Sequence, residues 1–331
     1  MIVGSRFFPP SGFARIRRAA ALFAAVCGVV CGVAAPGLAQ AAPQLPVPLG
    51  AAATRSALAS YGDVVSSPPG ANDWECRPAA AHPEPVVLLH GYTAGQAGNW
   101  QTLAPLLANN GYCVFSLTYG LGAAPGPATP GGAEIRVSAQ RDVAPFVDRV
   151  LEATGARQVN LVGHSMGTVV ARYYTKFLGG AGKVAESVNI TPLNNGTDVL
   201  GTATMTDLAA ELGVAELVDR VSLELGSTPG GNDLVRGSDL MNELNSGVAY
   251  EPTVDYTFIT TRYDELVVPF TSGLGPVAPN VTNIVVQDRC PDALFEHFTA
   301  ASDPVVAQYV LAALDPAAGT SIDCAGRPRN S

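Results

Sequence analysis

Short apolar runs alternate with longer amphipathic stretches from Trp74 to the carboxyl terminus. The runs are rich in Val, Leu and Ile, which is typical of parallel strands buried on both faces. Strand alternating with helix predicts an α/β protein, with a doubly wound, mostly parallel sheet of about six strands. The predicted strands are Val86–Leu89, Cys113–Leu117, Val159–Val162, Val184–Ile190, Tyr256–Thr261 and Val281–Gln287.

Helical periodicity predicts helices at about Trp100–Asn109, Glu134–Thr154, Met166–Phe177 and Asp303–Leu314. We assign residues 71–331 to one α/β domain. A segment at about 197–250 interrupts the alternation with short amphipathic pieces and a glycine-rich tract. We expect this helical insertion to lie above the carboxyl ends of the strands, which suggests a mobile lid.

The amino-terminal 41 residues have the pattern of a secretory signal peptide. Four arginines precede an apolar run at 19–30, and Ala39-Gln40-Ala41 provides an A-x-A cleavage site. The alternative, a transmembrane anchor, is disfavoured because the run is short and rich in alanine. We therefore expect a secreted protein cleaved near Ala41, without a stable membrane anchor. Residues 42–70 are rich in Pro, Ala, Ser and Gly without a sustained period, which is typical of a linker or an N-terminal arm.

Removal of the signal segment leaves 15 basic and 28 acidic residues. Such an acidic surface repels nucleic acid and anionic membranes, so nucleic acid is excluded as a partner.

Four cysteines remain after cleavage, an even number in an oxidising compartment, which predicts two disulfides. Three pairings are possible, and we favour Cys76 with Cys113 and Cys290 with Cys324 because each pair joins segments that are near in sequence. A metal site is disfavoured because no C-x-x-C or C-x-H spacing occurs, and we predict none.

The motif Gly163-x-Ser165-x-Gly167 follows the apolar run VNLV and precedes the helical stretch MGTVVARYYTKFL. This strand–turn–helix context is that of a nucleophile elbow, where a serine lies on a tight turn. Glycines are needed there because the strand and the helix pack closely around the serine. The alternative is a glycine-rich turn with an incidental serine. The context favours Ser165 as a nucleophile.

In a nucleophile-elbow protein the acid and then the histidine follow the serine along the chain. Of the four histidines in the chain, His297 is the one that follows Ser165, so it is the candidate base. The alternative is a surface histidine near a disulfide. Asp264 is the candidate acid because it lies just beyond the carboxyl end of a predicted strand. Its neighbour Glu265 leaves a one-residue ambiguity, and Asp288 is the second choice.

Acyl transfer also needs two N–H donors aimed at the developing oxyanion. The backbone amide of Met166, directly after the serine, is one candidate. The second is the backbone amide of Tyr92, in the loop after the first strong strand. The side chains of His90 and His164 are interpreted as structural, the former fixing this loop and the latter packing beside the elbow.

Several stretches resemble the secreted bacterial triacylglycerol lipases and esterases of the α/β-hydrolase fold, in the class 2 lipase family of actinobacterial type. The similar stretches, which begin at Asn72, are NDWECRPAAAHPEPVVLLHGYTAG, GNWQTLAPLLANNGYCVF, LVGHSMGT and TRYDELVVPF. The resemblance implies Ser165 as nucleophile, Asp264 as acid and His297 as base, with oxyanion donors at Tyr92 and Met166. It also implies the two favoured disulfides.

The sequence thus predicts a serine ester hydrolase that forms an acyl-enzyme and needs no cofactor. The expected substrate is a triacylglycerol or another ester, bound at an oil–water interface. The alternatives are a short-chain esterase, a polyester hydrolase, or an acyltransferase on the same fold. A binding module without catalysis is disfavoured because it has little reason to keep serine, acid and histidine in this order.

Overall fold

Six parallel strands form one sheet in the order β2-β1-β3-β4-β5-β6. The computed structural model describes residues 44–60, 62–122, 129–198, 228–319, 321–326 and 328. The predicted signal segment, 1–41, lies outside these residues. The strands are β1 Val86–Leu89, β2 Val114–Leu117, β3 Val159–His164, β4 Val184–Ile190, β5 Asp255–Thr260 and β6 Val281–Val285.

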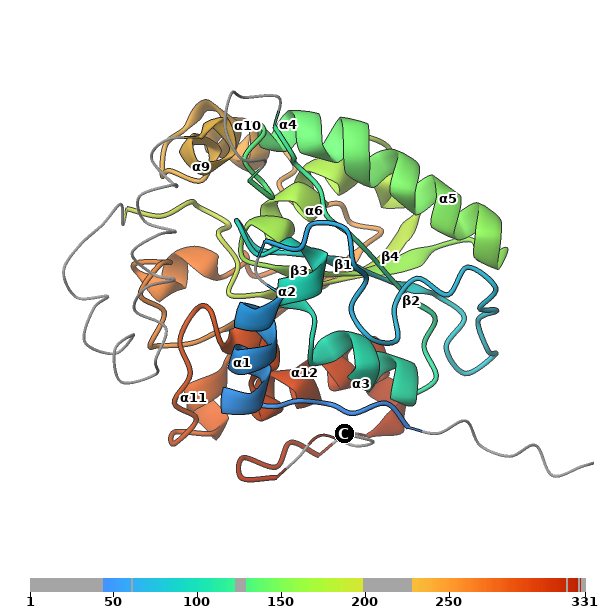
Figure 1. Ribbon diagram of the computed structural model, residues 1–331. Coiled ribbons are helices and arrows are strands. Elements are labelled where there is room, and N and C mark those ends of the chain that lie inside the picture. Colours follow the sequence, from blue (N-terminus) through green and yellow to red (C-terminus); the bar gives the residue numbers. More distant parts are fainter. Residues whose placement is uncertain are drawn as a thin grey trace, which may run out of the picture. The chain divides into compact units, whose positions relative to one another are not determined.

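Consecutive residues of the central strands pack into different cores, as expected for strands that are covered on both faces. On β1, Val87 and Leu89 join one buried cluster, whereas Val86 and Leu88 join the other. Helices α5 Ala144–Thr154 and α6 Met166–Phe177 contribute to the first cluster. Helices α3 Leu103–Asn109 and α12 Pro304–Leu314 contribute to the second. Figure 1 shows these two pairs on opposite sides of the sheet, so the predicted α/β fold class is confirmed.

Two predicted helices are divided in the structure. The stretch predicted at Trp100–Asn109 contains α3 alone, and a separate short helix, α2 Gly95–Asn99, precedes it. The stretch predicted at Glu134–Thr154 consists of α4 Ile135–Ser138, a π-helical turn at Ala139–Val143 and α5. Helix α11 Val286–Arg289 replaces the end of the last predicted strand. Single 3₁₀ turns lie at Gly180–Gly182, Phe270–Gly273, Ala300–Ser302 and Pro316–Ala318.

The predicted insertion is described in part. Two short helices lie in its second half, α9 Pro229–Asp233 and α10 Asp239–Asn245. Each is capped by a hydroxyl side chain, because Thr228 accepts from the Gly231 amide and Ser238 accepts from the Met241 amide. The first half of the insertion, 199–227, lies outside the described residues, and the suggested lid falls largely there.

The segment before Tyr61 packs against the domain as an arm. It contains α1 Ala51–Ala59, whose N-cap Gly50 provides no side-chain hydrogen bond. Asn109 at the end of α3 holds the arm through two hydrogen bonds with the Leu45 backbone, of 2.8 and 2.9 Å. The Thr102 hydroxyl donates to the Pro48 carbonyl at 2.5 Å. The arm is therefore attached at several points before α1 begins.

Both favoured disulfides are present in the structure. Cys76 pairs with Cys113 beside β2, and Cys290 pairs with Cys324, with Cα atoms 5.8 and 5.3 Å apart. The second disulfide joins the end of α11 to the C-terminal segment. Within the described parts of the chain, we find no helix with the length and apolar character needed to cross a bilayer.

Candidate active site

Ser165 lies in a tight turn between β3 and α6. Its backbone has φ 54° and ψ −123°, a conformation that residues with a Cβ rarely adopt. The turn depends on glycine at Gly167, where a Cβ would lie 2.0 Å from the carbonyl oxygen of Leu89 on β1. At Gly163 a Cβ would lie 2.8 Å from the Thr168 amide. The glycines therefore let β1, β3 and α6 approach closely around the serine.

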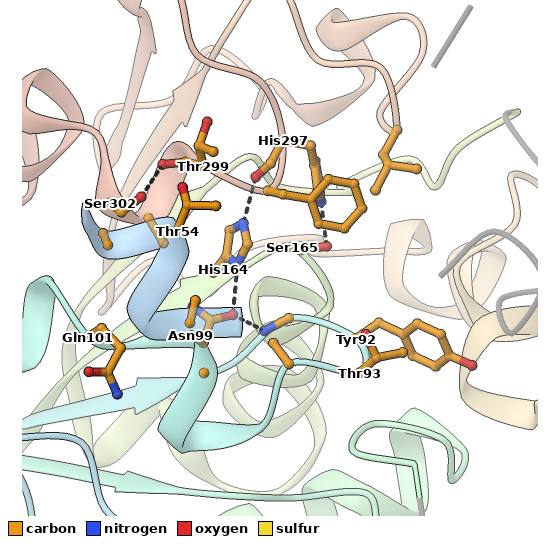
Figure 2. Close-up of a pocket in the computed structure, with 18 of the residues that line it drawn as sticks. Thr54, Tyr92, Thr93, Asn99, Gln101, His164, Ser165, His297, Thr299 and Ser302 are labelled. Atoms are coloured by element: carbon orange, nitrogen blue, oxygen red, sulfur yellow. Dashed lines mark hydrogen bonds between the residues drawn. The ribbon is translucent and has the colours of Figure 1, made fainter. Parts of the chain in front are cut away.

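The structure brings together three of the predicted site residues. His297 Nε2 lies 2.7 Å from Ser165 Oγ, and His297 Nδ1 lies 3.0 and 3.1 Å from the two carboxyl oxygens of Asp264. All three side chains are buried. Figure 2 shows the contact between Ser165 and His297 at the pocket. This series can carry a proton from the serine hydroxyl to the imidazole, with the carboxyl group orienting the ring.

Backbone amides hold the Asp264 carboxyl group in place. The residue follows β5, and its Oδ1 accepts from the amides of Leu266 at 3.1 Å and Val267 at 2.7 Å. The second-choice acid, Asp288, lies instead on α11, where it is exposed and pairs with Arg262. The structure therefore brings Asp264, and not Asp288, to His297.

The two predicted oxyanion donors are Met166, directly after the serine, and Tyr92, in the loop after β1. Met166 is the first residue of α6, so its N–H is one of those that has no acceptor within the helix. Tyr92 follows β1 and lines the same pocket as Ser165. Its hydroxyl group is 2.8 Å from the Thr228 hydroxyl, which fixes the side chain. Next to it, Gly91 is so near the elbow that a Cβ would lie 3.3 Å from the Cβ of Ser165.

A hydrogen-bonded network that includes His164 joins the loop after β1 to the segment around His297. Asn99 Oδ1 accepts from the Gly91 amide at 2.8 Å and lies 2.9 Å from His164 Nδ1. On the other side of the ring, His164 Nε2 lies 2.9 Å from the carbonyl oxygen of His297. Figure 2 shows this network between α1 and Ser165.

The His164 ring is neutral at ordinary pH. Burial, with a smaller contribution from the neighbouring His297 side chain, lowers the pKa of His164 to about 3. A neutral ring has one N–H, which donates to one of the two oxygens that face it. The sequence predicted that His164 packs beside the elbow. The sequence analysis did not single out Asn99. The one local sign of its role was an amide side chain close to the predicted oxyanion loop.

His90 fixes the loop after β1. Its Nδ1 lies 2.7 Å from the Gly91 carbonyl, and its Nε2 accepts from the Tyr119 amide at 3.1 Å. The ring stacks on that of Tyr119, whose hydroxyl donates to the His90 carbonyl at 2.5 Å. Burial lowers the pKa of His90 to about 4, so this ring is also neutral. These contacts agree with a structural interpretation of this histidine.

Two further carboxyl groups support the His297 segment. Glu265 Oε2 accepts from the His297 amide at 3.3 Å, and Glu296 accepts from the amides of Phe298 at 2.6 Å and Thr299 at 3.0 Å. Burial, together with the negative charges of Glu296 and Asp264, raises the pKa of Glu265 to about 9. Glu265 is therefore protonated at neutral pH. The sequence left Glu265 open as an alternative acid. In the structure its carboxyl group contacts the main-chain amide of His297 and not the ring.

An apolar pocket opens onto the serine. It is bordered by leucines, alanines, threonines and aromatic side chains, and none of its described lining residues is Asp, Glu, Lys or Arg. Tyr92, Ser165 and His297 are among its lining residues. The pocket therefore suits a neutral, largely apolar molecule. In the described ranges of the chain, no group of three or more His, Cys, Asp and Glu side chains is arranged to hold a metal ion.

The fold and the site together define an α/β-hydrolase enzyme. The serine lies on a strand–turn–helix elbow, and the aspartate and the histidine come from later segments at the carboxyl edge of the sheet. A family model described as Lipase (class 2) matches residues 83–310. The chain therefore belongs to the class 2 lipase family.

Solved structures share this fold at low sequence identity. Aspergillus fumigatus lipase B matches with a TM-score of 0.59 and 15% identity, over 80% of this chain. The present chain spans 61% of that lipase. The mature form of Bacillus licheniformis lipase BlEst2 matches with a TM-score of 0.50 and 15% identity, over 72% of this chain and 94% of that one.

Proposed function

We propose that this protein is a secreted serine carboxylic-ester hydrolase, and that its substrates are triacylglycerols. The observation that carries the proposal is the 2.7 Å contact between Ser165 Oγ and His297 Nε2, with Asp264 on the other nitrogen of the same ring. Each group is buried and fixed by further hydrogen bonds, as a site prepared for reaction requires.

In the first step, Ser165 Oγ attacks the ester carbonyl carbon while His297 Nε2 takes its proton. Asp264 orients the ring through Nδ1 and stabilises the imidazolium. The amides of Tyr92 and Met166 stabilise the negative charge on the carbonyl oxygen. His297 then gives the proton to the leaving alcohol oxygen as the bond between carbon and that oxygen breaks. The acid part of the ester remains bound to Ser165 as an acyl-enzyme.

In the second step, water attacks the acyl-enzyme. His297 takes a proton from the water, and the same two amides stabilise the second oxyanion. The proton then passes to Ser165 Oγ as the carboxylic acid leaves. Every proton transfer in the two steps is assigned to His297, so the proposed reaction requires no cofactor.

The choice of a lipid ester rests on the pocket and on the family. The described lining of the pocket has no charged side chain, and leucines at 193, 234 and 266 border it. A neutral ester with long hydrocarbon chains fits such a lining, because each methylene removed from water stabilises the complex by about 0.8 kcal/mol. Membership in the class 2 lipase family supports the same choice.

Export is part of the proposal. The arginines, apolar run and A-x-A site of the first 41 residues support cleavage near Ala41. Two disulfides, Cys76–Cys113 and Cys290–Cys324, are typical of a protein that folds in an oxidising compartment. Mass spectrometry of the N-terminus of the protein recovered from the culture medium tests this part.

The test of the activity is hydrolysis of p-nitrophenyl esters from C2 to C16 and of emulsified triacylglycerol, with the purified mature protein and its Ser165→Ala variant. We expect activity that extends to long chains and is lost in the variant. An organophosphonate probe should label the parent protein and not the variant. Labelling that persists in Ser165→Ala would contradict the assignment of the nucleophile.

Other outcomes identify the alternatives. Hydrolysis confined to short chains indicates an esterase. Release of a new ester when an alcohol is added, at a rate above hydrolysis, indicates an acyltransferase. Release of monomers from a polyester film, without activity on triacylglycerol, indicates a polyester hydrolase.

A further inference from the structure

One wall of the pocket is formed by helix α1, Ala51–Ala59, which precedes the residues matched by the family model. Four of its side chains line the pocket together with Ser165: Ala53, Thr54, Ala57 and Leu58. They recur at the spacing of one helix face, whereas Arg55 and Ala59 are exposed. Figure 2 shows α1 on one side of the pocket and Tyr92 on the other.

We propose that α1 is a wall of the substrate site, along which an apolar chain of the ester lies, and that its small side chains set the length of chain that the enzyme accepts. This inference rests on the proposed function. It deepens that function by assigning chain-length selection to a segment outside the matched family region.

The side chains on α1 have the chemistry of such a wall. Ala53 and Ala57 are small and leave space in front of the helix, and Leu58 is 44% exposed. An exposed leucine at a pocket border offers apolar contact to a chain that extends past Ala57. None of the lining residues that the structure describes is Asp, Glu, Lys or Arg. The wall therefore suits hydrocarbon.

The position of α1 depends on its contacts with the domain. A helix of nine residues without a side-chain N-cap is not stable alone. The Gly50 amide donates to the Ser302 carbonyl at 3.3 Å, and the Thr102 hydroxyl donates to the Pro48 carbonyl. Both Ser302 and Thr102 line the pocket themselves. Helix α1 is thus held in place by residues that themselves line the pocket.

The decisive comparison is between Ala57→Phe and Ala59→Phe in the full mature protein. Phe at 57 places a ring in the space where the chain is proposed to lie, whereas Phe at 59 points to solvent from the same helix. Two ester series are measured: p-nitrophenyl esters from C2 to C16, and butyrate esters of alcohols of increasing length. The readout is the ratio of kcat/KM for long and short members of each series.

We expect Ala57→Phe to lower this ratio in at least one series by about fourfold for each methylene that loses its contact. Ala59→Phe should keep the ratio of the parent enzyme. The affected series shows whether the acyl chain or the alcohol chain lies along α1. Unchanged ratios in both series would overturn the inference.

A second variant covers the case in which Ala57→Phe does not fold. Leu58→Ala removes an apolar side chain at an exposed position, and it should lower the ratio for the longest members of the same series. A parent-like ratio in Leu58→Ala would then overturn the inference. If the parent enzyme hydrolyses none of these esters, it is the proposed function that fails, and this result is distinct from a normal parent profile that α1 does not influence.

Discussion

His164 Nε2 lies 2.9 Å from the carbonyl oxygen of His297, so the residue before Ser165 contacts the residue that partners Ser165. The same ring lies 2.9 Å from Asn99, which holds the Gly91 amide in the loop before Tyr92. One buried ring therefore connects the elbow, the predicted oxyanion loop and the proposed base.

We expect His164→Phe to lower kcat about tenfold to a hundredfold with a smaller change in KM. The oxygen that accepts the single ring N–H, on Asn99 or on the His297 main chain, loses its donor, while the pocket wall keeps its bulk. The measurement is kcat, KM and the pH–rate profile on p-nitrophenyl butyrate, scaled by organophosphonate titration. His82→Phe is the matched control, since the His82 ring packs against the Tyr112 ring in a tilted arrangement and does not line the pocket. A parent-like kcat in His164→Phe would show that the network does not position the base.

The second prediction tests which aspartate is the acid, since the sequence offered both Asp264 and Asp288. Asp264→Asn should lower kcat by roughly 10⁴-fold, because Asn cannot hold His297 in the required tautomer or stabilise its charged form. Asp288→Asn removes a partner of Arg262 on α11 and should leave kcat near that of the parent. Steady-state kinetics of the two variants side by side provide the measurement. The acid assignment is wrong if the larger loss follows Asp288→Asn.

Much of the fold was predictable because its central strands are largely buried on both faces. A run such as Val86–Leu89 is recognisable from its apolar composition alone, and the α/β fold class is confirmed. Ser165, Asp264 and His297 could be singled out because the nucleophile-elbow arrangement fixes their order along the chain. The structure brings these three together.

Other features could not be predicted because they depend on contacts between distant segments. Asn99 acts on His164 across 65 positions, and nothing local in the sequence marks this contact. Helix α1 has no strong apolar period and no N-cap side chain, so its position follows from the surface on which it packs. The raised pKa of Glu265 comes from its burial in the folded protein and from Glu296, which lies 31 residues later.

The close approach of α6 and β1 provides a prediction on stability. Gly167→Ala should lower the free energy of unfolding by about 3 kcal/mol or prevent folding, because the new Cβ would lie 2.0 Å from a main-chain oxygen of β1 that cannot move alone. Gly182→Ala is the control, since a Cβ there meets no atom within 4 Å. Its effect should stay within about 0.5 kcal/mol. Urea unfolding followed by circular dichroism measures both, and equal stabilities in the two variants would contradict the proposed packing constraint.

The last prediction concerns the dependence of stability on pH. The carboxyl group of Glu265 has an ordinary pKa of 4.5, and in the folded protein its pKa is raised to about 9. The folded state therefore binds a proton that the unfolded state loses between these values, and the parent protein loses stability as pH rises through this range. Glu265→Gln keeps an oxygen that can accept from the His297 amide, and it does not titrate. The Tm of the variant relative to the parent should therefore increase from pH 5 to pH 9.

Differential scanning calorimetry at several pH values measures this difference. Glu152→Gln, at an exposed position of α5, corrects for the general effect of removing one acidic side chain. A Tm difference between Glu265→Gln and the parent that stays constant over the range would mean that the Glu265 proton is not held by the fold. An increase that survives the correction would mean that the proposed base is supported by a neutral carboxyl group, because Glu265 contacts the main chain of His297.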